Sequence, residues 1–285
     1  MTPRDLSVPE VVLDGLCFPE GPRWHEGKLW FSDMHGHRVM TVGLDGVAQA
    51  VVEVPAAPSG LGWLPDGRLL VVSMEDRRLL RLDAGGLTEV ADLSRLATFH
   101  CNDMVVDAQG RAYVGNFGFD LHAGATPVPA ALILVLPDGT ARVAAADLMF
   151  PNGTVITPDG RTLIVGESFG PRLTAFDVAP NGSLGNRRVW AALASAVPDG
   201  ICLDADGAIW VASPISAEVL RVREGGTITD RVRVSTQAFA CMLGGPQRRH
   251  LFICTASGSD PQACRERRDG RIEVVEVEVP GAGWP

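Results

Sequence analysis

The sequence predicts an all-β fold, a six-bladed β-propeller with four-stranded blades. Three observations predict it. Short apolar runs of Val, Leu and Ile are separated by turn signals such as Pro65-Asp66-Gly67-Arg68 and Pro158-Asp159-Gly160-Arg161, which are typical of β-hairpins. A related tetrapeptide precedes each hairpin and recurs six times. The interval between recurrences is the length of one four-stranded propeller blade.

The first expected element is an N-terminal strand over about residues 8–14, which contains the apolar run Val11-Val12-Leu13. It precedes the first tetrapeptide and therefore lies outside the repeats. We expect it to pair with the last strands, within residues 272–279, and so to close the ring of a single domain over residues 1–285. A solenoid of the same period would need capping repeats at its ends, and the sequence suggests none.

Six repeats follow in order. Their tetrapeptides are Phe18-Pro19-Glu20-Gly21, Ala57-Pro58-Ser59-Gly60, His100-Cys101-Asn102-Asp103, Phe150-Pro151-Asn152-Gly153, Val197-Pro198-Asp199-Gly200 and Phe239-Ala240-Cys241-Met242. The third residues are separated by 39, 43, 50, 47 and 42 positions. An insertion over residues 120–129 accounts for the longest step, and it is either a lid over the channel or a surface loop. Helical periodicity is nearly absent, and only residues 93–99 are compatible with a turn or two of helix.

Composition excludes several classes of function. The chain has 285 residues and a formal charge of −9, so sequence-independent binding to nucleic acid is not expected. No apolar run approaches the roughly 20 residues of a membrane span, and the first residues lack the apolar stretch of a secretion signal. Six scattered cysteines indicate reduced thiols. We therefore expect a cytoplasmic protein, a monomer or small homo-oligomer, that acts on a small molecule away from membranes.

The third position of each tetrapeptide is expected to carry the chemistry. The first strand of a propeller blade lines the central channel, so the side chains at its start converge at one mouth. Glu20, Asn152 and Asp199 would there form an oxygen ligand set for a single divalent cation, with open positions for water and substrate. Calcium is favoured, and zinc, manganese, magnesium or iron would also be accommodated. No other cofactor is expected. Each residue taken alone is better explained as a turn residue, but the convergence of the three favours a metal site.

At these residues the chain resembles the family of senescence marker protein (regucalcin), gluconolactonase and luciferin-regenerating enzyme. The most specific motifs are Phe18-Pro19-Glu20-Gly21-Pro22-Arg23-Trp24, Cys101-Asn102-Asp103-Met104-Val105-Val106-Asp107, Pro151-Asn152-Gly153 and Pro198-Asp199-Gly200. The resemblance implies that Glu20 and Asn152 are metal ligands, that Asp199 is both a ligand and the catalytic base, and that Asn102 contacts substrate. Lactonases of this family that act on sugar acids often carry an arginine two residues before that asparagine. His100 stands there instead, which disfavours a gluconate-like substrate.

The ends of the second strands are expected to line the rim of the same mouth. They bring many apolar side chains and few groups that would bind a polyol, so the substrate should be less polar than a sugar lactone. Packing between blades is the alternative for these Met and Phe residues, and a surface position is the alternative for the histidines. The residues expected to bind substrate are Asn102, His100, Met34, His35, Met74, Phe117, Phe119 and Phe169.

Together these features predict a divalent-metal-dependent hydrolase that opens a lactone or related small cyclic ester by attack of activated water, with Asp199 and Asn102 as its catalytic residues. Three alternatives stay open. One is a calcium-binding regulatory propeller without turnover. Another is a metal-dependent hydrolase of a different activated ester, such as a phosphotriester. The third is a scaffold propeller that binds peptides on one face.

Overall fold

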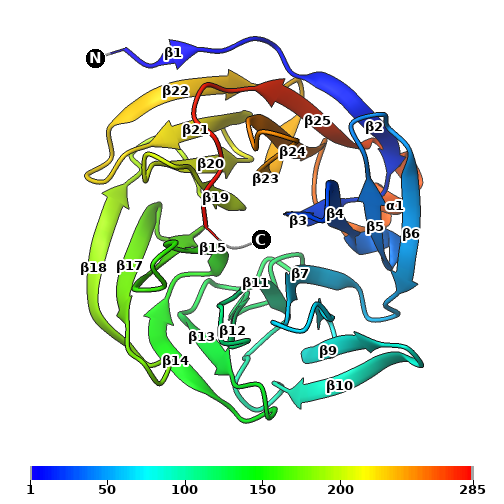
Figure 1. The fold of residues 1–285 in the computed structure, drawn as a ribbon, viewed down its shortest axis with the longest axis vertical. Helices are drawn as coiled ribbons and strands as arrows, with labels where there is room; N and C mark the ends of the chain where they lie inside the picture. Colours follow the sequence, from blue (N-terminus) through cyan, green and yellow to red (C-terminus); the bar gives the residue numbers. More distant parts are fainter. Residues whose placement is uncertain (1, 284–285) are drawn as a thin grey trace.

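The computed structural model describes residues 2–283, whose strands form six sheets arranged as the blades of a closed ring (Figure 1). The all-β, six-bladed propeller with four-stranded blades is therefore confirmed. Blades 1 to 3 consist of β3 (Pro19–His25), β4 (Lys28–Asp33), β5 (Arg38–Val42) and β6 (Ala48–Glu53); β7 (Pro58–Trp63), β8 (Leu69–Ser73), β9 (Arg78–Asp83) and β10 (Gly86–Asp92); and β11 (Cys101–Val106), β12 (Ala112–Asn116), β13 (Ala130–Val135) and β14 (Ala141–Leu148).

Blades 4 to 6 complete the ring. They consist of β15 (Pro151–Ile156), β16 (Thr162–Glu167), β17 (Arg172–Val178) and β18 (Leu184–Ala192); β19 (Ile201–Leu203), β20 (Ile209–Ser213), β21 (Glu218–Val222) and β22 (Ile228–Arg233); and β23 (Gln237–Gly244), β24 (His250–Ala256) and β25 (Gly270–Glu276). A 3₁₀ turn, η1 (Met34–Gly36), and one helix, α1 (Pro261–Arg267), lie between strands. No helix within residues 2–283 is long and apolar enough to span a membrane.

Both ends of the chain contribute to the closed ring. Strand β2 (Glu10–Leu16) pairs antiparallel with β25 and supplies the fourth strand of blade 6. Strand β1 (Arg4–Asp5) adds a short parallel edge to β22 of the neighbouring blade. After β25 the chain turns in toward the centre of the ring (Figure 1), where the N–H of Ala282 donates to the carbonyl of Leu203 at 2.9 Å. Early and late segments thus hold each other in place.

The predicted turns explain why the strands begin and end where they do. Gly67, Gly110, Gly160 and Gly207 all have positive φ angles, of 84°, 75°, 70° and 77°, which glycine adopts at little cost. Each closes the hairpin between the first and second strands of its blade. Inner strands such as β7 are buried along their whole length, whereas the outer strand β6 is mostly exposed. Apolar side chains therefore pack between neighbouring blades, with Phe31, Trp210 and Phe252 among the largest that are fully buried.

The recurring tetrapeptide forms a β-bulge at the start of the inner strand. The register of the first hairpin shifts between Pro58 and Leu61 in blade 2 and between Pro151 and Thr154 in blade 4. Bulges of this kind re-aim a side chain and are frequent beside active sites. The fourth residue is usually glycine because the next inner strand approaches it closely. A Cβ atom on Gly60 would lie 2.4 Å from the backbone nitrogen of Met104.

Replacing Gly60 with alanine is therefore expected to destabilise the ring by about 1–3 kcal/mol, since the added methyl group overpacks two backbones. Gly85→Ala is the matched control, because its Cβ would meet no atom within 4 Å and its φ angle is not positive. Urea unfolding of both variants measures the difference. Equal midpoints for Gly60→Ala and Gly85→Ala would show that the close approach does not constrain this position.

The sequence allowed a turn or two of helix over residues 93–99, and the structure has a single turn there, in which the carbonyl of Leu93 accepts from the N–H groups of Leu96 and Ala97. Helix α1 was not anticipated, although Asp260 caps it by accepting from the N–H of Ala263 at 2.8 Å and Pro261 occupies its first turn. That pairing of cap and proline is a recognisable helix start.

Candidate functional site

The third residues of four tetrapeptides meet in one cavity. Glu20 on β3, Asn102 on β11, Asn152 on β15 and Asp199 just before β19 line a space of about 260 Å³. Because these inner strands all begin at the same end of the ring, the cavity lies at one mouth of the central channel. Ser59, the equivalent residue of blade 2, is buried beside Asn102, and its Oγ donates to the Asn102 Oδ1 at 3.4 Å.

The sixth blade has a different residue at this position from the one predicted. The N–H of Gly153 donates to the carbonyl of Asp199, and in the next blade the N–H of Gly200 donates to the carbonyl of Phe239. Phe239 is thus the counterpart of Asp199, and it is the bulged residue between Ala238 and Ala240.

The prediction of Cys241 at the third position of blade 6 was wrong by two residues. Cys241 is 2% exposed and packs in the core, with its Sγ 3.9 Å from that of Cys202. The tetrapeptide of this blade lacks both proline and glycine, so no residue marked the register. All six cysteines are free thiols.

The two carboxyl groups at the third positions, Glu20 and Asp199, are unfavourable as a charged pair. Burial raises the pKa of Glu20 to about 8, and the nearby charge of Asp103 adds to this effect. Burial also raises the pKa of Asp199 well above its ordinary value, and the negative charge of Glu20 is the second largest cause of this increase. In each case one hydrogen bond, from Gly21 to Glu20 and from Asn152 to Asp199, partly offsets the shift. A bound cation would remove this repulsion.

The two asparagines are oriented by their neighbours. The Nδ2 of Asn152 donates to the Asp199 Oδ1 at 2.5 Å and to the Ser168 Oγ at 3.1 Å. Because the Nδ2 of Asn152 already makes these two hydrogen bonds, Oδ1 is the atom of this side chain that can bind a ligand. The Nδ2 of Asn102 is buried and has no hydrogen-bond partner within residues 2–283. An unpaired buried donor is costly, so this atom is suited to a substrate oxygen.

A buried ion pair supports the site from within the channel. Arg23 donates from Nη2 to the Asp103 Oδ1 at 2.7 Å and to the carbonyl of Met104, and from Nη1 to the carbonyl of Pro22. Both side chains are 7% exposed. Asp103 follows Asn102 directly, so the pair anchors the strand segment that presents Asn102.

The walls of the cavity include most of the predicted rim residues. Met34, His35, Met74, His100, Phe117 and Phe169 all line it. Burial lowers the pKa of His35 to about 4 and lowers that of His100, so both rings are neutral near pH 7. Phe119 is an exception to the predicted set: it is buried behind the wall, with ring centroids 5.0 Å from Phe169 and 5.9 Å from Phe150. It stabilises the wall and does not face the cavity.

Several lining residues were not among the predicted contacts. Leu121 and His122 of the 120–129 insertion reach the cavity, which fits the lid alternative for that loop. Ile215 and Glu75 were recognisable as ends of second strands. The segment after β24, by contrast, contributes Ser259 and Pro261, and only the position of α1 brings them to the mouth.

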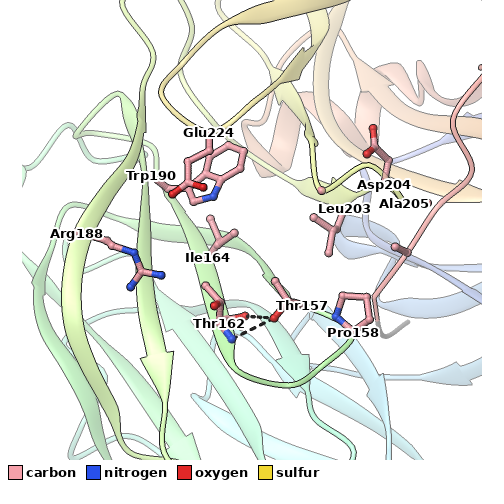
Figure 2. Close-up of a pocket in the computed structure, with 12 residues that line it drawn as sticks. Thr157, Pro158, Thr162, Ile164, Arg188, Trp190, Leu203, Asp204, Ala205 and Glu224 are labelled. Carbon is pink, nitrogen blue, oxygen red and sulfur yellow. Dashed lines mark hydrogen bonds between the residues drawn. The ribbon is translucent and has the colours of Figure 1, made fainter.

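A second cavity of similar size has a buried carboxylate in its lining, but that group is already hydrogen-bonded within the protein. The cavity lies between blades 4 and 5 at the opposite end of the inner strands, with Thr157, Trp190 and Asp204 in its lining (Figure 2). Asp204 is fully engaged there, since its Oδ2 accepts from the Arg221 Nε at 2.7 Å and its Oδ1 from the N–H of Ala208 at 3.0 Å. The mouth that carries Glu20 and Asp199 is therefore the candidate active site.

Comparison with known proteins agrees with this fold. Residues 18–257 match the family model described as SMP-30/Gluconolactonase/LRE-like region. The chain belongs to this family. A pentonolactonase of Haloferax volcanii is 27% identical over 292 residues, which cover 98% of this chain and 97% of the relative. A 6-deoxy-6-sulfogluconolactonase of Pseudomonas putida is also 27% identical, with 96% of each chain covered. The structure of a calcium-binding regucalcin from Agrobacterium tumefaciens superposes with a TM-score of 0.82 at 22% identity, covering 100% of this chain and 98% of the other.

The donor set of this SMP-30/gluconolactonase/LRE-like propeller fits a hard divalent cation. Two carboxylates and the Asn152 Oδ1 are oxygen ligands of the kind that calcium, magnesium and manganese prefer. Within residues 2–283, no group of three or more His, Cys, Asp and Glu side chains is arranged to hold a metal. The candidate set therefore depends on an amide oxygen, and the raised pKa values of Glu20 and Asp199 are the feature that favours a cation there.

Proposed function

We propose that this propeller is a divalent-metal-dependent hydrolase that opens a lactone or related small cyclic ester. The observation that carries the proposal is the convergence of Glu20, Asn152 and Asp199 beside the unpaired Asn102 Nδ2 in one cavity. The names of two full-length relatives, a pentonolactonase and a 6-deoxy-6-sulfogluconolactonase, support the lactone as substrate. Oxygen ligands favour calcium, and the free state of all six thiols agrees with a reducing, cytoplasmic location.

The chemistry follows from the positions of these groups. A divalent cation held by Glu20, Asn152 and Asp199 would act as a Lewis acid on the substrate carbonyl. Asp199 takes the proton of a water molecule as its oxygen bonds to the carbonyl carbon. Asn102 donates from Nδ2 to a substrate oxygen and orients the ring. The ring C–O bond then breaks, and the proton on Asp199 passes to the leaving alkoxide, which gives the open hydroxy acid.

Metal removal tests this function. The protein is stripped with a chelator and restored with calcium, zinc, manganese or magnesium in turn, and acid release is followed with aliphatic, aromatic and sugar lactones. We expect a loss of at least about 100-fold in kcat/KM on stripping and recovery with one or two of the ions, because the cation stabilises charge in the transition state. Full activity after complete metal removal would contradict the mechanism.

One alternative retains specific support. One of the similar solved structures is that of a calcium-binding regucalcin. This name is consistent with a propeller that binds the ion and catalyses no reaction. This alternative predicts calcium binding by calorimetry without hydrolysis of any lactone or of a phosphotriester by the same preparation. Hydrolysis of a phosphotriester alone would instead identify another class of ester as the substrate.

A further inference from the structure

Two aromatic walls stand above the polar floor of the candidate active site. On the side of blades 6 and 1, the rings of Phe239 and Phe18 meet edge to face with centroids 4.7 Å apart, and His35 stacks on Phe18 at 5.1 Å. On the side of blades 3 and 4, Phe117 and Phe150 approach to 4.5 Å. All of these residues line the cavity. A ligand whose ester lies on the floor would therefore extend between two apolar surfaces.

The lining also contains the polar side chains of Glu75, His122 and Gln237. Glu75 and His122 are exposed and Gln237 is half-buried, so these groups lie toward solvent, whereas the rings of the two walls are buried. His35 contacts the carbonyl of Ser259 through Nε2 at 3.2 Å, and the Ser168 Oγ donates to the carbonyl of Pro198 at 2.7 Å. His100 stacks on Phe99 with centroids 4.1 Å apart. A polyol held against the buried rings of the two walls would leave its hydroxyl groups on that side without partners, and each such buried group is costly. The walls thus disfavour a sugar and favour hydrocarbon.

The size and opening of the cavity fit a substituent on the ring. Its volume of about 260 Å³ equals that of about nine water molecules in the liquid, so a bare five-membered lactone would leave part of it empty. At the mouth, Ile215 is 72% exposed and Phe169 is 41% exposed, and both still line the cavity. Apolar side chains therefore line the cavity both in its buried part, at Phe150 and Phe239, and at its solvent-exposed mouth, at Ile215 and Phe169.

We propose that the two walls form a subsite for a hydrocarbon substituent of the lactone, and that Phe239 is the residue that determines this specificity. The proposal rests on the proposed lactone-opening function. Phe239 occupies the position that carries Glu, Ser, Asn, Asn and Asp in the other five blades, and it places an aromatic ring next to the polar floor. An asparagine at this place would restore a polar group on that wall without changing the bulge.

The test compares γ-butyrolactone with γ-lactones that carry n-alkyl chains of increasing length, in the metal-loaded protein. In the wild type, kcat/KM should rise about fourfold for each buried methylene group. The slope should flatten in Phe239→Asn and persist in Phe239→Leu, which stays apolar. Ile215→Asn, at an exposed position that tolerates a polar side chain, should lower kcat/KM only for the longest chains. Val143→Thr, on the outer strand β14, is the matched control and should behave as the wild type.

Binding of n-alkyl γ-lactams, followed by calorimetry, gives a readout independent of turnover. If affinity for the lactams rises with chain length and this trend is lost in Phe239→Asn, the subsite is supported even where no lactone is hydrolysed with any metal, and only the proposed function fails. If lactones are hydrolysed but neither kcat/KM nor lactam affinity depends on chain length, the subsite is overturned. The same conclusion follows if Phe239→Asn and Ile215→Asn leave both trends unchanged.

Discussion

Asp199→Asn is expected to lower kcat/KM for lactone hydrolysis by about a thousandfold, since a positioned general base contributes between 10²-fold and 10⁴-fold. The substitution keeps the shape of the side chain and an oxygen that can accept from the Asn152 Nδ2. It removes the negative charge that holds the cation and the group that takes the proton. Kinetics followed by acid release, with calorimetry of metal binding, measure both losses.

The same substitution should stabilise the metal-free protein. Burial and the charge of Glu20 raise the pKa of Asp199 well above its ordinary value, so keeping it ionised at pH 7 costs folding free energy that asparagine does not require. The midpoint of thermal unfolding without metal should therefore rise. Asp138→Asn, in an exposed turn, is the control and should change neither property. An Asp199→Asn protein within about threefold of wild-type kcat/KM would rule out Asp199 as the base.

Arg23→Leu is expected to cause the largest loss of stability, about 3–5 kcal/mol, because it leaves the buried Asp103 carboxylate without its partner. For a chain of this size the change corresponds to a fall in unfolding midpoint of about 10 °C. Arg188→Leu is the matched control. Its partner Asp177 is 54% exposed, so the loss should stay below about 1 kcal/mol.

A double variant separates the ion pair from simple packing. Arg23→Leu combined with Asp103→Leu replaces both charges by apolar groups, and we expect it to be more stable than Arg23→Leu alone, since no unpaired charge is left buried. Urea unfolding of the two single variants and the double variant completes the cycle. If Arg23→Leu lowers the free energy of unfolding no more than Arg188→Leu does, the Arg23–Asp103 ion pair does not stabilise the fold.

The turns and tetrapeptides that recur in successive blades were the most predictable part of this protein. The Asp-Gly turns fixed the hairpins through backbone conformations that glycine favours, and the Pro-x-Gly tetrapeptides located the inner strands because a bulge and a close strand approach need those residues. The resemblance to the SMP-30/gluconolactonase/LRE-like family is confirmed over residues 18–257. Glu20, Asn102, Asn152 and Asp199 line one cavity because each is the third residue of its tetrapeptide.

Residues outside the repeat pattern were not predictable in the same way. The tetrapeptide of blade 6 has no proline or glycine, so the choice between Phe239 and Cys241 needed the hydrogen bond from Gly200. Phe119 and Phe117 are two positions apart and equally apolar, yet Phe117 lines the cavity and Phe119 supports the wall behind it. Local sequence does not distinguish these roles, because both satisfy the same preference for burial.

By itself, the sequence determined the number of blades and placed Glu20, Asn102, Asn152 and Asp199 at the channel mouth, since turn chemistry and the repeat period act over a few residues. Tertiary structure alone decided the environment of those residues. Burial and mutual repulsion of Glu20 and Asp199, the commitment of the Asn152 nitrogen and the place of Phe239 on the wall all depend on contacts between blades that are far apart in the chain. Such contacts leave no local pattern, because they arise only when the ring closes.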